Sequence, residues 1–100
     1  MFDFVEAIVT MLPFEVGGRT SPVMPRHGSY QPFARLGRTL QRVRFIEGPP
    51  VLSPGESARV VLEVYADALR VSQGTDIDLV ELEGQTVGIA TILRVWPAVA

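Results

Sequence analysis

The stretch that decides the fold is residues 53–68, SPGESARVVLEVYADA. Successive side chains of a β-strand point to opposite faces, so alternation of apolar and polar residues predicts a strand with one buried face. We predict a strand over residues 56–68. The expected inward side chains are Ala58, Val60, Leu62, Val64 and Ala66. The expected outward side chains are Arg59, Glu63 and Asp67, together with the less polar Val61 and Tyr65.

A turn is predicted directly before this strand, at Pro54-Gly55. Proline presets φ for the first central position of a type II turn, and glycine supplies the positive φ that the second central position requires. The chain should therefore reverse direction here.

Five more stretches are predicted to be strands, because they alternate and end at glycine or proline. They are residues 3–12, 31–36, 39–47, 76–83 and 85–96. In the first, Val5, Ala7, Val9 and Met11 share one face, and Phe4, Ile8 and Leu12 make the other face partly buried. In the third, Val43 and Phe45 should point inward and Arg42 and Arg44 into water. No stretch has a helical period, so we predict an all-β sandwich or small barrel of six strands.

Length and composition favour one globular domain over residues 1–100, with 47% hydrophobic residues and a net charge of −2. Cysteine is absent, so disulfides and thiolate chemistry are excluded. The apolar N-terminus contains Asp3 and Glu6 and has no preceding basic residue, which fits neither a signal peptide nor a membrane span. We expect a cytoplasmic protein. All nine basic residues are arginine, which favours a G+C-rich bacterial source.

Residues 12–33, LPFEVGGRTSPVMPRHGSYQPF, are predicted to form a long loop between the first two strands. Gly17-Gly18 allows positive φ and close backbone approach, and the three prolines that follow withhold amide donors. From Gly17 to Ile46 the chain has no acidic residue. It has six arginines there: Arg19, Arg26, Arg35, Arg38, Arg42 and Arg44.

These arginines have two interpretations. In the first, the arginines form a patch that binds RNA phosphates or an acidic protein surface, because the guanidinium group binds both in bidentate fashion. Alternatively, Arg38, Arg42 and Arg44 are a solvated strand face that pairs across the sheet with Glu63 or Asp67. The acidic isoelectric point, about 5.3, argues against a general nucleic-acid binder.

No catalytic or metal-binding constellation is expected. His27 is the only histidine and has no evident nucleophile or second ligand, and Ser29-Tyr30 and Trp96 have no triad or cofactor partner. Asp76 and Asp78 share a strand face, but two carboxylates are too few for a hard cation that takes six or more oxygens.

Four motifs resemble the C-terminal (third) domain of translation elongation factor Tu. Residues 14–20, FEVGGRT, are similar to that family's acidic-Gly-Gly-Arg-His-Thr segment without its histidine, and residues 30–33, YQPF, to its Tyr-Arg-Pro-Gln-Phe. Residues 54–56, PGE, and 84–88, GQTVG, resemble its Pro-Gly-Asp and its Gly-Arg/Lys-Thr-Val-Gly. The order and spacing of these motifs extend from about Phe4 to Val95.

The resemblance implies a six-stranded antiparallel barrel that contacts the T stem of aminoacyl-tRNA, a GTPase domain and an exchange factor. By position, Arg19 and Thr20 would match the RNA-facing loop, and Gly84 a second RNA-facing turn. The family's Arg-Glu-Gly-Gly is replaced here by residues 81–84, ELEG, so a basic position has become acidic. The chain has no lysine and therefore no phosphate-binding loop, so no GTP is expected to bind this chain alone.

The fold prediction is a single compact six-stranded antiparallel β-barrel like that domain. The predicted function is a stand-alone binding module without catalysis or cofactor, which docks a protein partner or itself, since Val23, Met24 and Phe33 offer apolar contacts. The alternative is RNA or tRNA binding related to translation; an enzyme would require a pocket with convergent polar groups. The predicted partner-binding residues are Arg19, Thr20, Met24, Arg26, Phe33, Arg35, Arg38, Arg42 and Arg44, and Gly84 is the possible RNA-facing turn.

Overall fold

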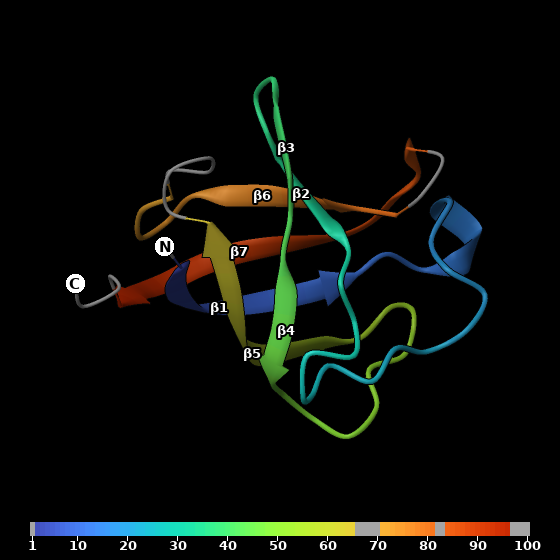
Figure 1. Cartoon of the computed structure of the whole chain (residues 1–100). Coiled ribbons are helices and arrows are strands. Elements are labelled where there is room, and N and C mark those ends of the chain that lie inside the picture. Colours follow the sequence, from blue (N-terminus) through green and yellow to red (C-terminus); the bar gives the residue numbers. More distant parts are fainter. Residues whose placement is uncertain (1, 66–70, 82–83, 97–100) are drawn as a thin grey trace.

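A computed structural model of the chain describes residues 2–65, 71–81 and 84–96 (Figure 1). Its strands are β1 (Phe2–Met11), β2 (Phe33–Leu36), β3 (Thr39–Arg42), β4 (Arg44–Glu47), β5 (Ser57–Tyr65), β6 (Asp76–Val80) and β7 (Thr86–Trp96). The one helical element of the described residues is the 3-10 turn η1 (Phe14–Val16), which the sequence analysis did not predict. None of these residues forms a helix of the length and apolar character that would cross a membrane.

The seven strands form one antiparallel sheet in the order β3-β2-β6-β7-β1-β5-β4. The sheet curls into an open half-barrel around its core, with β7 at the centre between β6 and β1 (Figure 1). The all-β, antiparallel prediction is therefore confirmed at this level.

Alternation along the strands builds the core. Val60, Leu62 and Val64 are buried on the inner face of β5, as predicted, and Ala58 is partly buried. Ala66 and Asp67, with the end of the predicted strand at 66–68, lie outside the described residues, as do residues 82–83 of the predicted strand at 76–83. The buried residues of the other strands are Val5, Ala7, Val9, Met11, Ala34, Phe45, Ile77, Leu79, Val80, Val87, Ala90 and Ile92.

The predicted closed, six-stranded barrel needs a correction at residues 39–47. This stretch is not one strand: it divides at Val43 into β3, which pairs with β2, and β4, which pairs with β5. β3 and β4 are consequently the two edges of the sheet, although only one residue separates them in sequence. Among the described residues there are seven strands in an open half-barrel.

Pro32 explains the break at Val43. The register that pairs Phe33 with Arg42 places Pro32 opposite Val43, and the Val43 amide donates to the Pro32 carbonyl over 2.9 Å. In an antiparallel ladder such a pair exchanges two hydrogen bonds, but proline has no amide hydrogen to return the second. The ladder between β2 and β3 therefore ends here, and β2 starts at Phe33 rather than at the predicted Gln31.

Two predicted turns have the expected geometry. Gly55 has φ +86° and the Glu56 amide donates to the Ser53 carbonyl over 3.0 Å, as a type II turn requires. In the loop after β1, Gly17 has φ +95°, and a Cβ on Gly18 would lie 2.0 Å from the Leu12 carbonyl oxygen. The Gly17-Gly18 pair thus supplies both the positive φ and the close approach expected of it.

Candidate partner-binding surfaces

The six arginines of residues 17–46 come from three parts of the chain: the loop before β2, the β2–β3 hairpin and β4. The loop that carries Met24 and Arg26 runs across the lower part of Figure 1, whereas the hairpin of β2 and β3 projects from the top. Arg35, Arg38 and Arg42 belong to this hairpin. The loop and the hairpin share one cleft, lined by Arg19 and Arg42, whereas Arg26 of the loop lines another.

Three of the arginines are paired with carboxylates. Arg19 forms an ion pair with Glu81, Arg35 pairs with Asp78 over 3.0 Å, and Arg44 pairs with Glu63 over 3.2 Å. The last pair is one that the solvated-strand interpretation predicted. The other predicted acidic partner, Asp67, lies outside the described residues.

The other three arginines have no carboxylate partner among the residues that the structure describes. Arg26 donates to the Gly48 carbonyl over 2.6 Å. Arg42 donates to the Gln31 carbonyl over 3.1 Å and lies 4.6 Å from the centroid of the Phe33 ring. Arg38 occupies the two-residue turn between β2 and β3 and is exposed. Their positive charges are available to a partner.

Arg19 belongs to a polar cluster that the sequence analysis missed. The Tyr30 hydroxyl donates to Glu81 Oε2 over 2.6 Å, and this same oxygen accepts from the Arg19 guanidinium, which also lies 5.7 Å from the centre of the Tyr30 ring. Burial, the hydrogen bond to Glu81 and the charge of Glu81 raise the pKa of Tyr30 above its ordinary value, although the Arg19 charge opposes them. The cluster is internally satisfied and keeps Tyr30 protonated.

The two turns that the resemblance marks as RNA-facing lie side by side. The Gln85 side chain donates to the Gly17 carbonyl over 2.6 Å, next to the ion pair between Arg19 and Glu81. Gly84 follows in the second turn with φ +81°, and Thr20 is exposed in the first. The charge of Arg19 at this junction is balanced by Glu81, so the junction does not present an isolated cation.

A cleft of about 390 Å³ joins this cluster to the start of β2 and β3. Its walls include Arg42 and Phe33 on one side and Arg19, Tyr30 and Glu81 on the other. Three predicted partner-binding residues, Arg19, Phe33 and Arg42, thus meet in one place.

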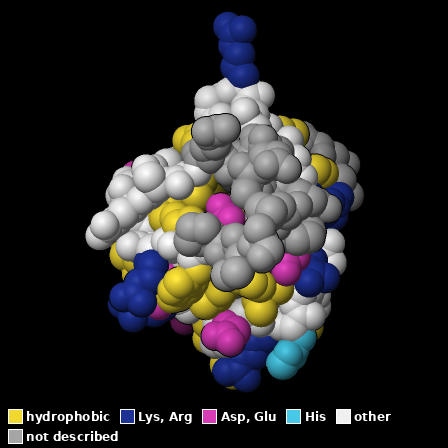
Figure 2. All heavy atoms as spheres, turned by 60° about the vertical axis from the view of Figure 1, so that its left-hand side comes forward, with side chains coloured by type: hydrophobic (Ala, Val, Ile, Leu, Met, Phe, Trp, Pro, Cys, Tyr) yellow, Lys and Arg dark blue, Asp and Glu magenta, His cyan; other side chains and the backbone are white. Residues whose placement is uncertain are grey.

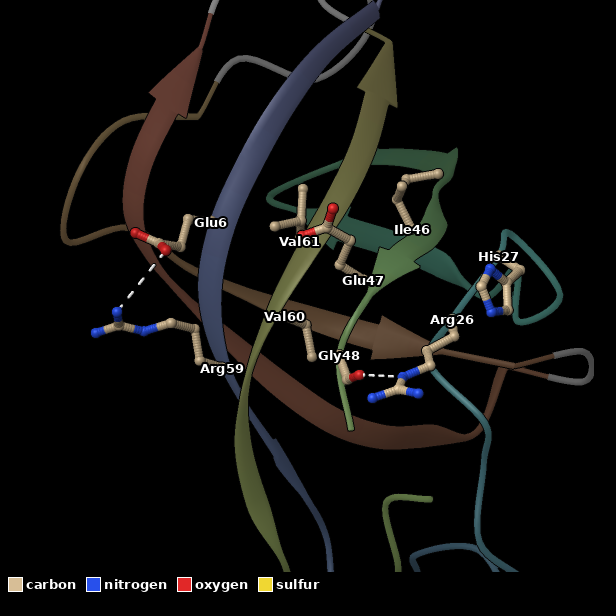
Figure 3. A pocket seen from close by; sticks show the side chains of 9 residues that line it. All are labelled: Glu6, Arg26, His27, Ile46, Glu47, Gly48, Arg59, Val60 and Val61. Atoms are coloured by element: carbon tan, nitrogen blue, oxygen red, sulfur yellow. Dashed lines mark hydrogen bonds and ion pairs between the residues drawn. The ribbon is translucent and has the colours of Figure 1, made fainter. Parts of the chain in front are cut away.

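A second cleft, of about 460 Å³, lies on the outer side of β1, β4 and β5 (Figure 3). Ile46, Glu47 and Val61 lie between two pairs of polar side chains: Glu6 with Arg59 on one side, and Arg26 with His27 on the other (Figure 3). Glu6 and Arg59 are 3.8 Å apart. Glu6 and Arg59 pair with each other and Arg26 donates to the Gly48 carbonyl, and the apolar side chains of Ile46 and Val61 lie between them.

Ile46 and Val61 also line a shallow cleft beside Phe4 and Trp96, which are 42% and 39% exposed. On the side of the molecule seen in Figure 2, hydrophobic side chains gather among arginines, carboxylates and the single histidine. In the sequence, these clefts were indicated only by apolar residues on the outer faces of predicted strands, namely Phe4 in the first strand and Val61 in the fourth. Phe4 was expected to be partly buried and Val61 to point outward, and neither was expected to line a cleft.

The described residues contain no group of three or more histidine, cysteine or acidic side chains placed to hold a metal ion. Asp76 accepts a hydrogen bond from Thr91 over 2.6 Å and Asp78 is paired with Arg35, so each of the two carboxylates has its own partner. His27 is exposed in the loop beside Arg26 and has φ +59°.

In comparisons with known proteins, no protein-family model matches the chain and no curated protein matches it either.

Proposed function

We propose that this chain is a non-catalytic binding module that docks a protein partner through the exposed arginines of the β2–β3 hairpin. The observation that carries the proposal is the contrast among the arginines: Arg19, Arg35 and Arg44 are paired with carboxylates, whereas Arg38 and Arg42 are not, within the described part of the chain. Arg42 also stacks on Phe33 at the rim of a cleft. A stacked arginine beside an aromatic ring is typical of protein-binding surfaces.

The half-barrel, the adjacent loop and turn at Arg19 and Gly84, and the four sequence motifs together favour a relationship to the third domain of elongation factor Tu. A partner protein is favoured over tRNA because Arg19, which the resemblance assigns to RNA, is neutralised by Glu81. A phosphate at this position would meet a carboxylate next to the guanidinium, which weakens the attraction.

The test uses the full chain with the protein that it captures from its native host, purified separately, and with a tRNA transcript. We expect a partner that binds at near-physiological salt and whose affinity falls at least about tenfold in the variant Arg38→Glu/Arg42→Glu. Arg59→Glu, a charge reversal in the cleft of Figure 3, is the matched control and should leave the affinity unchanged.

The tRNA titration provides the contrary outcome. If the arginines bind about four phosphates, affinity should fall roughly 100-fold between about 50 and 200 mM salt, because each neutralised phosphate releases close to one counterion. Tight, salt-dependent tRNA binding that is lost in Arg38→Glu/Arg42→Glu would contradict protein docking, because the same arginines would then bind phosphates. Met24→Asp, a change at a 65% exposed side chain outside the hairpin, should leave binding through the hairpin unchanged.

A further inference from the structure

The outer edge of β3 is a backbone surface that no described strand occupies. β3 pairs with β2 alone, while the neighbouring β5 pairs with β1 on one side and β4 on the other. A strand with an unpaired edge is a ready template for another extended chain.

The register identifies the backbone groups that face outward. Hydrogen-bonded and non-hydrogen-bonded pairs alternate along an antiparallel ladder, and the bond from the Val43 amide to Pro32 fixes the phase. The pairs of Phe33 with Arg42 and of Arg35 with Leu40 are therefore the non-hydrogen-bonded ones. The amides and carbonyls of Leu40 and Arg42 consequently point away from β2, toward the open edge.

The side chains at this edge determine which partner fits. Leu40 is 54% exposed, and Arg42 lies on the same face two residues along, with Phe33 and Arg35 opposite on β2. The only carboxylate paired with these arginines in the described residues is Asp78, bound to Arg35. The edge therefore combines an apolar position, an unpaired cation next to it and a second cation, Arg38, at the turn.

The same charges disfavour a second copy of this chain as the occupant. Two β3 edges brought together would place arginines close to arginines, and like charges across a strand pair are destabilising. Such charged edges are a recognised protection against self-pairing. A carboxylate in the incoming strand has the opposite effect, since it pairs with Arg42 or Arg38.

From this edge we propose that β3 accepts an extended acidic segment of a partner protein as an additional strand, with an apolar side chain opposite Leu40 and a carboxylate two residues away, opposite Arg42. Main-chain hydrogen bonds to Leu40 and Arg42 hold the segment, and the alternate side chains select it. This inference rests on the proposed protein-docking function and names the site and the class of ligand for it.

The experiment uses a synthetic probe, a capped peptide in which valine and glutamate alternate with threonine, and follows the backbone amides of the full chain by NMR. Binding should shift the amides of Leu40 and Arg42 most and slow their hydrogen exchange. Two changes should each weaken binding at least about tenfold: replacement of the glutamates by lysines, and N-methylation of the peptide amides that face β3.

Two protein variants separate the edge from other surfaces. Leu40→Pro removes an amide hydrogen that points away from β2, so it should abolish peptide binding. The melting temperature of the variant shows whether the fold is kept. The N-methylated peptide gives the same information without any change in the protein. Arg59→Glu should bind the peptide as the unchanged chain does.

Shifts centred on Phe4, Ile46 and Trp96 instead of β3, binding that is insensitive to N-methylation, or no binding at all would overturn the inference. Failure of the peptide while the captured partner still depends on Arg38 and Arg42 would reject strand addition and leave the proposed function standing. A partner that depends on Met24 but not on Arg38 and Arg42 would reject both, since the hairpin would not be the docking site.

Discussion

The two edges of the sheet, β4 and β3, differ in how their backbone is covered, although they are consecutive in sequence. The loop before β2 covers β4: His27 and Gly28 donate to the carbonyls of Ile46 and Phe45 over 3.0 and 2.8 Å, and Phe45 donates to the Tyr30 carbonyl over 3.0 Å. No equivalent segment of the described chain covers β3. One edge is therefore part of the folded core, and the other is available for binding.

The side chains follow the same division. Phe45 of β4 is fully buried and packs edge-on against Tyr30, with ring centroids 5.0 Å apart. Leu40 of β3 is more than half exposed. Proteins protect the edges of their sheets from unwanted pairing by covering them or by placing charged side chains on them. This chain has a loop over the β4 edge and arginines at the β3 edge.

The largest expected effect is on stability, from truncation of the aromatic side chain of β4. Phe45→Ala should lower the free energy of unfolding by roughly 3–5 kcal/mol, because it removes a fully buried ring and leaves a cavity. Leu40→Ala, the matched change at the exposed edge, should stay within about 0.5 kcal/mol of the unchanged chain. Urea denaturation of the three proteins checks this, and similar losses in both variants would remove the distinction between the edges.

The next prediction concerns the pH dependence of stability, through Tyr30 in the segment that covers β4. The raised pKa means that the folded state keeps the Tyr30 proton when the unfolded state begins to lose it, near pH 10. The contribution of Tyr30 to the free energy of unfolding is therefore constant below about pH 10. It is lost as pH rises through the folded-state pKa.

The chain has no lysine and no cysteine, so its two tyrosines are the only side chains that ordinarily titrate near pH 10. Tyr30→Phe should reduce the loss of stability between about pH 9 and pH 11, although it lowers stability at neutral pH by removing the hydrogen bond to Glu81. An equally steep alkaline loss in the variant would show that Tyr30 does not cause it.

The smallest effect compares an arginine of β4 with the arginine of the β2–β3 turn. Arg44→Gln breaks the ion pair between β4 and Glu63, and should cost up to about 1 kcal/mol at low salt and less at high salt, since the Arg44 side chain is about half exposed. Arg38→Gln, at the tip of the β2–β3 hairpin, should leave stability unchanged within about 0.5 kcal/mol. Thermal melts at two salt concentrations measure both, and a larger loss in Arg38→Gln would be contrary to this assignment.

Local alternation was sufficient to predict the strands and much of the core. Val60, Leu62 and Val64 are buried, and the Pro54-Gly55 turn forms, because both features depend on neighbouring residues alone. The break at Val43 could not be read in this way, since the alternation continues through it from Arg42 to Phe45. Its cause is Pro32, which directly precedes β2 and lies opposite Val43, so the break becomes evident only when the register is known.

The candidate site was predictable only in part, for the same reason. The arginines were evident as a cluster in sequence, but the loop, the hairpin and β4 (Figure 1) distribute them so that Arg19 and Arg42 line one cleft and Arg26 another. Arg19 and Glu81 are 62 residues apart, and no periodicity shows that they meet. The outer clefts beside Val61 likewise depend on side chains from several strands.

Hydrogen exchange of individual backbone amides, measured by NMR on the free chain, tests the difference between the two edges most directly. The amides of Gly28 and Phe45, which bond across the β4 edge, should be protected, and those of Leu40 and Arg42 should exchange at nearly the rate of an unstructured peptide. Protection of Leu40 and Arg42 equal to that of Phe45 would show that the β3 edge is already paired in the free protein, and would contradict both the open half-barrel and the docking site proposed on it.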